Sequence, residues 1–89
     1  MKNQILRSSV SIPSNIAEGS ERKSIPDFQR FLNIALGSAA ELRTQVYISF
    51  EIGIFRTEVT NELIQELKSI SKMLQALHKS LNNSKTVNA

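Results

Sequence analysis

The chain has 89 residues and a mass of 10.0 kDa, which gives room for one small domain with a thin core. Hydrophobic residues make up 40% and charged residues 21%, an ordinary balance for a globular domain. The lack of cysteine excludes disulfides, thiolate zinc sites and cysteine nucleophiles, and the single histidine, His78, leaves no histidine pair for a metal. We therefore expect no enzyme, no cofactor and no metal.

Charge is distributed unevenly along the chain. The formal net charge is +3, yet residues 41–66 hold five glutamates against two arginines, and residues 68–89 hold four lysines and no acid. Acids near the start and bases near the end of one helix would complement the helix dipole. The alternative interpretation is a basic patch that binds an anionic partner. No uncharged run approaches the about 18–20 residues of a membrane span, so a cytoplasmic protein without membrane contact is expected.

The first predicted helix covers residues 2–22. Ile5, Ser9, Ile12, Ile16 and Gly19 recur at alternating spacings of four and three, which is typical of an apolar helix face. Pro13 removes one backbone N–H inside this segment, so the helix either bends or splits. Because the apolar spacing keeps its phase across Pro13, we favour one bent helix.

The second predicted helix runs over residues 26–52. Ser24 is a suitable N-cap, with Pro26 in the first turn and Asp27 at the position of a capping-box acid. The small residues 37–40 favour the close approach of another helix. After the last turn, Gly53 is a natural left-handed cap.

The third predicted helix starts at residue 57 or 58 and ends near residue 81. Its apolar positions form a seam with spacings of four and three: Leu63, Leu67, Ile70, Leu74, Leu77 and Leu81. The polar end of the chain, residues 83–89, is expected to be a disordered tail. A helical bundle domain over residues 1–82 remains.

Three long helices without a strand signal predict an all-α fold, an antiparallel up-down helical bundle. Three helices leave apolar flanks without a cover: Ile34, Leu36, Ile48 and Ile64. Either a helix is missing from this chain or other copies cover these flanks, and both explanations can hold together. We therefore expect a homo-oligomer.

The motif SIPSNIAEG at residues 11–19 resembles the bacterial four helix bundle protein family, also called the 23S rRNA-intervening sequence protein family. The resemblance continues through residues 28–42 and the last helix, and it covers about residues 2–82. It implies a four-helix bundle, assembly into homopentameric rings and no established enzymatic activity. A relative, the accessory variability determinant of diversity-generating retroelements, is a basic pentamer that binds nucleic acid and a reverse transcriptase.

Two departures from the family pattern stand out. Members usually begin with a further long helix, which this sequence lacks, so that Met1 stands where the family has an internal hydrophobic residue. A mis-assigned start codon, a genuinely short member and a trimmed sequence are the competing explanations, and we favour the first. Arg43 stands at a position that tends to be acidic in the family. Glu41 is expected to pair with Arg7 or Arg43.

The motif residues allow two interpretations. In the structural one, Pro13 sets a bend, Gly19 ends the helix and the polar stripe serves assembly. In the functional one, Ser11, Asn15 and Glu18 contact a neighbouring subunit or a ligand. We favour the structural interpretation for the whole set of motif residues, which comprises Ser11, Pro13, Asn15, Glu18, Gly19, Gly37, Ser38 and Glu41.

The basic residues are the strongest functional signal. Lys68, Lys72 and Lys79 share one helix face, and such a surface would bind nucleic acid electrostatically rather than read its sequence. Few aromatic residues (6%) and no tryptophan argue against base stacking. The candidate contacts are Lys2, Arg7, Arg22, Lys23, Lys68, Lys72 and Lys79.

The predicted function is therefore that of a non-enzymatic protein. It assembles into a pentameric ring and acts as an accessory binder of nucleic acid or of a ribonucleoprotein. The alternative is a purely structural or protein–protein interaction module without nucleic-acid binding.

Overall fold

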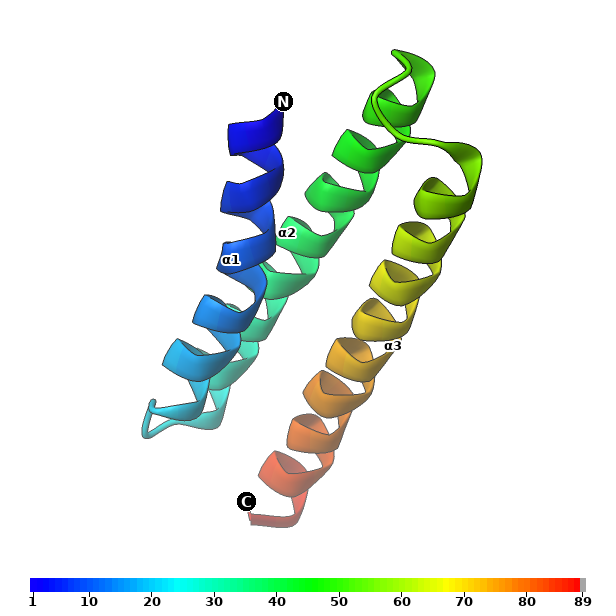
Figure 1. Cartoon of the computed structure of the whole chain (residues 1–89). Coiled ribbons are helices and arrows are strands. Elements are labelled where there is room, and N and C mark those ends of the chain that lie inside the picture. The colour runs from blue at the N-terminus through cyan, green and yellow to red at the C-terminus, as the bar shows by residue number, and fades with distance from the viewer. Residues whose placement is uncertain (89) are drawn as a thin grey trace.

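The computed structural model describes the backbone of residues 1–88 and the side chains of residues 1–82. This part of the chain contains three α-helices and no strand: α1 (Lys2–Ser20), α2 (Ile25–Glu51) and α3 (Thr57–Asn88). Each helix runs antiparallel to the one before it, as Figure 1 shows. The predicted all-α up-down arrangement is confirmed, and α1 and α2 match their expected bounds to within two residues.

The last helix is longer than its apolar seam predicts. α3 extends to Asn88, past the expected end near Leu81. The side chains of residues 83–89 lie outside the described part of the structure. The disordered tail therefore stays a prediction.

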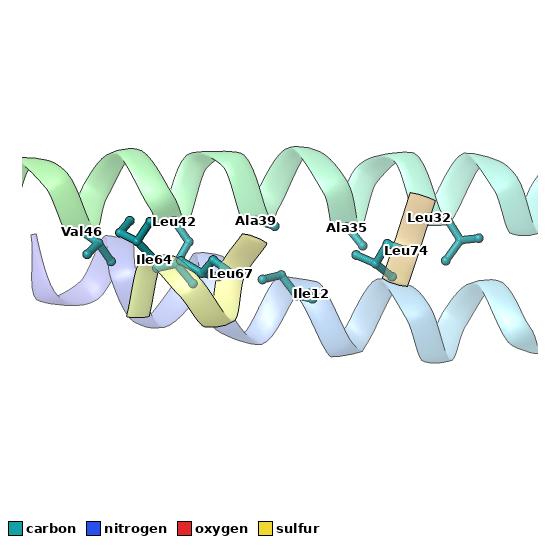
Figure 2. Packing of buried hydrophobic residues seen from close by; sticks show 9 residues of the cluster. All are labelled: Ile12, Leu32, Ala35, Ala39, Leu42, Val46, Ile64, Leu67 and Leu74. Carbon is teal, nitrogen blue, oxygen red and sulfur yellow. The ribbon is translucent and has the colours of Figure 1, made fainter. Parts of the chain in front are cut away.

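The middle helix organises the fold. α1 and α3 each pack closely against α2, and among the described residues the backbones of α1 and α3 do not approach each other in the same way. Of the nine core residues drawn in Figure 2, α2 supplies more than the other two helices together. The core comprises Ile12 of α1, Leu32, Ala35, Ala39, Leu42 and Val46 of α2, and Ile64, Leu67 and Leu74 of α3.

Local sequence signals explain where α2 begins and ends. Ser24 has an extended backbone, and its hydroxyl accepts a hydrogen bond from the N–H of Asp27 at 3.2 Å. At the other end Gly53 has a φ of +84°. Its N–H donates to the carbonyl of Phe50 at 3.0 Å, and the N–H of Ile54 donates to that of Ser49 at 2.8 Å. These bonds form a Schellman motif, so both predicted caps are confirmed.

Pro13 lies inside α1 without dividing it. The helix is continuous from Lys2 to Ser20, which excludes the split that was the alternative.

The four apolar residues that were expected to be uncovered agree only in part with expectation. Ile34 and Ile48 of α2 are exposed. Leu36 of α2 is partly buried against the core, and Ile64 is a core residue, because its side of α3 faces α2.

Candidate assembly and binding surfaces

Ser11 of the SIPSNIAEG motif and Ser8, which precedes the motif, join α1 to α2 within one chain. The hydroxyls of Ser11 and Ser38 lie 2.7 Å apart, and Asn15 Nδ2 donates to the carbonyl and the hydroxyl of Ser11 at 2.8 and 3.0 Å. The Ser8 hydroxyl donates to Glu41 Oε1 at 3.1 Å. This seam therefore satisfies polar groups at the α1–α2 interface. Glu18 lies outside it, exposed and paired with Arg22.

Glu41 does not form the ion pair that we expected. Its carboxylate accepts hydrogen bonds from Ser8 and, at 3.3 Å, from Gln45 Nε2. Among the described side chains, the ion pairs join Arg22 to Glu18 and Arg30 to Asp27. The prediction for Glu41 was wrong because uncharged donors of α1 and α2 surround this carboxylate.

Gly19 has a different role from the predicted helix end. α1 continues to Ser20, and the C-cap residue Glu21 has an ordinary right-handed backbone. A Cβ atom on Gly19 would lie 2.8 Å from Phe31 Cβ and 2.9 Å from Phe28 Cδ1. Glycine is needed here because the first two turns of α2 pass so close.

Gly37 does not make the close contact expected of it. A Cβ atom there would meet nothing within 4 Å. The small residues that do let the helices approach are Ala35 and Ala39, which are buried, and Ser38, which bonds to Ser11. The periodicity of α2 turns Gly37 to the outer side of the helix.

An apolar groove opens between α1 and α3. Its cavity volume is about 640 Å³, and Leu42 and Val46 of α2 form its floor. Phe55 closes one end. Ser9 and Glu66 are its polar members. The walls are Ile5, Ser9, Ile12, Pro13 and Ile16 from α1, and Leu63, Glu66, Leu67, Ile70, Met73, Leu74 and Leu77 from α3.

The outer edges of the groove are apolar too. Leu6 and Val10 on α1 are 53% and 59% exposed, and Met73 on α3 is 64% exposed. Leu6, Val10, Pro13 and Ala17 are spaced by four, three and four residues, so they form a second stripe on α1, which shares Pro13 with the groove wall. We call these four residues the α1 ridge. Their spacing was visible in the sequence, but their exposure depends on where α2 and α3 lie.

The structure does not gather the seven candidate basic residues into one surface. Lys68, Lys72 and Lys79 are exposed on one face of α3, and none of them lines the groove. We call these three residues the α3 lysine stripe. The other four residues lie elsewhere. Lys2 and Arg7 are exposed near the start of α1, and Arg22 and Lys23 lie at the turn between α1 and α2.

Arg22 also takes part in an aromatic contact that the sequence did not suggest. The guanidinium carbons of Arg22 and Arg30 lie 5.0 and 4.5 Å from the centre of the Phe31 ring. Both distances are in the range of cation–π interactions. Because Arg22 also pairs with Glu18, its charge is already engaged within the chain.

Neither a metal centre nor a membrane-spanning helix occurs in the described part of the chain. No group of three or more His, Cys, Asp or Glu side chains is arranged there to hold a metal ion. No helix there is long and apolar enough to cross a membrane.

Three antiparallel helices, a polar α1–α2 seam and an open apolar groove define a small helical-bundle protein. The model of the 23S rRNA-intervening sequence protein family matches residues 1–76, so the chain belongs to that family. This confirms the resemblance carried by the SIPSNIAEG motif. No curated protein matches the chain.

A solved structure is similar over most of the chain. It is the crystal structure of a protein of unknown function from the S23 ribosomal protein family of Bacteroides thetaiotaomicron. The identity is 32% and the TM-score 0.84, and the match covers 86% of this chain and 71% of that chain. Neither the family description nor that of the neighbour names an enzymatic activity.

Proposed function

We propose that this chain is a non-enzymatic module that assembles with copies of itself in the cytoplasm. The observation that carries the proposal is the uncovered apolar groove between α1 and α3, together with the exposed Leu6, Val10 and Met73 beside it. A monomer seldom leaves a contiguous apolar surface of this kind in water, because covering it is favourable by about 25 cal/mol per Å². The resemblance to family members that form rings supports five copies.

Light scattering on the purified chain tests self-assembly. The expected result is a mass that is an integral multiple of 10.0 kDa at micromolar protein concentration, with five as the multiple. A discrete multiple other than five would contradict the ring of five copies but would still support self-assembly. A stable 10.0 kDa monomer would contradict the proposal as a whole.

A second function, accessory binding of nucleic acid, is supported by the α3 lysine stripe. Its three side chains are exposed on one face and take part in none of the ion pairs found among the described residues. Bases on such a stripe attract the phosphate backbone without reading the sequence. Repetition of the stripe in an assembly multiplies the contacts, which raises the overall affinity.

Titration of labelled RNA and DNA at several salt concentrations tests this second function. We expect log K to fall linearly with log salt, with a slope of about 0.9 per phosphate contact on duplex DNA. The triple variant K68Q/K72Q/K79Q should flatten that slope, whereas Lys23→Gln, an exposed lysine outside the stripe, should change it little. If the unaltered protein does not bind at low salt, the chain is a protein–protein interaction module without this second function.

A further inference from the structure

We propose that the end of the molecule between α2 and α3 pairs two copies of this chain tip to tip. Five exposed apolar side chains form the surface that pairs, and we call them the tip patch: Tyr47, Ile48, Phe50, Ile52 and Ile54. None of the five lines the groove or belongs to the lysine stripe. This inference therefore stands or falls separately from the self-assembly proposed above.

The tip patch lies at and beyond the end of the stretch of α2 that α1 covers. The hydrogen bond between Ser11 and Ser38 sets the antiparallel register of α1 and α2, which brings Met1 level with Ile48. The loop between α2 and α3 extends further, as Figure 1 shows. Packing between the three helices therefore leaves this end of the molecule uncovered.

The size of the tip patch suits a weak pairwise contact. Ile52 and Ile54 are 62% and 57% exposed, and the other three members precede them on the last two turns of α2. The largest apolar patch on a typical monomer measures about 300–600 Å². Two such patches face to face can bury about 1,000 Å² together, which is the lower limit for a specific interface.

Two charges at the tip have the opposite sign to the one that their helix ends favour. Glu51 is the last residue of α2, where the helix dipole favours a base, and Arg56 directly precedes α3, where the dipole favours an acid. Glu58, in the first turn of α3, has the favoured sign. Glu51 and Arg56 are both exposed, and neither takes part in the ion pairs found among the described residues. The stability of the single chain does not explain these two charges, whereas a partner of opposite charge at each place would compensate both.

A second copy of the chain supplies that compensation. One tip can be turned onto another in two ways, because the end of α2 lies on one side of the tip and the start of α3 on the other. In the first way, like charges face each other across the contact. In the second way, Glu51 of each copy faces Arg56 of the other, and the C-terminal end of α2 faces the N-terminal end of α3. The second arrangement is attractive and closes after two copies, since an isologous contact uses the same patch on both.

Light scattering over a range of protein concentrations tests the pairing. We expect the mass measured at micromolar concentration to double when the concentration is raised about 100-fold, since a contact of this size binds weakly. Ile52→Glu should prevent the doubling with helical circular dichroism retained, because Ile52 is exposed. Ile34→Glu is the matched control at an exposed apolar position of α2 outside the tip patch, and it should leave the doubling intact.

Charge reversals test whether the occupant is a second copy. Glu51→Arg or Arg56→Glu alone places like charges opposite each other, so either change should abolish the doubling. Each of these changes also improves the match to its own helix dipole, so a loss of folding is not expected. The double variant E51R/R56E places opposite charges across the contact again and should restore the doubling. A different protein partner would not be regained in this way, because its own charges stay as they were.

The outcomes separate this inference from the proposed self-assembly. A mass that does not double overturns the inference, leaves the tip to a partner of other chemistry and does not affect the ring. Doubling that survives Ile52→Glu, or that E51R/R56E fails to restore, also overturns it. A micromolar monomer that doubles through the tip contradicts the ring and supports this inference.

Discussion

Gly19 and Gly37 show how one residue type meets two environments in neighbouring helices. Gly19 lies where α1 approaches the first turns of α2, and there is no space for a side chain. Gly37 lies in the middle of α2 with open space around it, so its lack of a side chain costs helix stability without improving packing.

Alanine substitutions should therefore have opposite effects at these two glycines. Gly19→Ala should lower the free energy of unfolding by about 1–3 kcal/mol, because the new methyl group overlaps Phe31 and Phe28. Gly37→Ala should raise it by about 0.5–1 kcal/mol through better helix propensity. Urea unfolding followed by circular dichroism measures both changes. Equal effects at the two positions would contradict this account.

Within α1, Pro13 interrupts the hydrogen bonds without ending the helix. It cannot donate to the carbonyl of Ser9, four residues earlier. The neighbouring Ser9 hydroxyl donates to the carbonyl of Leu6 at 2.8 Å. The hydrogen-bonded seam and the core contact of Ile12 hold α1 on α2 through this weak point.

Pro13→Ala should make α1 more stable as an element. We expect the free energy of unfolding to rise by about 1–3 kcal/mol, because the N–H that proline lacks is restored. Ser14→Ala, at the adjacent exposed position, is the matched control and should change stability by about 0.5 kcal/mol or less. If Pro13→Ala destabilises the protein in urea unfolding, the local shape set by proline is required for packing on α2.

Sequence reasoning succeeded where a feature depends on a few neighbouring residues. Ser24 and Gly53 delimit α2 as expected, since a cap needs only the adjacent backbone. It failed for Gly37, Ile64 and Glu41, whose environments depend on which side of a helix meets another helix. For the same reason the SIPSNIAEG motif revealed the family but not its contacts with Ser38. The groove could not be predicted from the sequence, because it depends on how far apart α1 and α3 lie on α2.

At the scale of the whole molecule, the chain exposes two surfaces of different chemistry. The apolar groove faces outward between α1 and α3, and the lysine stripe occupies another face of α3. Assembly through the groove would leave the lysines free for an anionic partner. The two proposed functions are therefore compatible, and each can be removed by substitutions that leave the other in place.

If assembly covers the groove, thermal stability should depend on protein concentration. Only the folded chain forms the groove, so association through the groove stabilises the folded state by mass action. For a chain of this size, a tenfold rise in concentration should raise Tm by about 5 °C. Val10→Glu places a charge on the exposed apolar edge of the groove, so it should abolish the dependence of Tm on concentration. Scanning calorimetry at several concentrations measures it, and a constant Tm for the unaltered chain would contradict assembly-linked folding.

The central position of α2 also has a consequence for how the molecule opens. Since the close backbone contacts of α1 and of α3 are both made with α2, either outer helix can detach while the remaining pair stays in contact. Amide hydrogens of α2 then exchange with solvent only when both partners have left, whereas those of α1 and α3 exchange through separate, smaller openings. The chain thus consists of two helical hairpins, α1–α2 and α2–α3, that share α2. We expect α2 to be the last helix whose amide hydrogens become accessible to exchange.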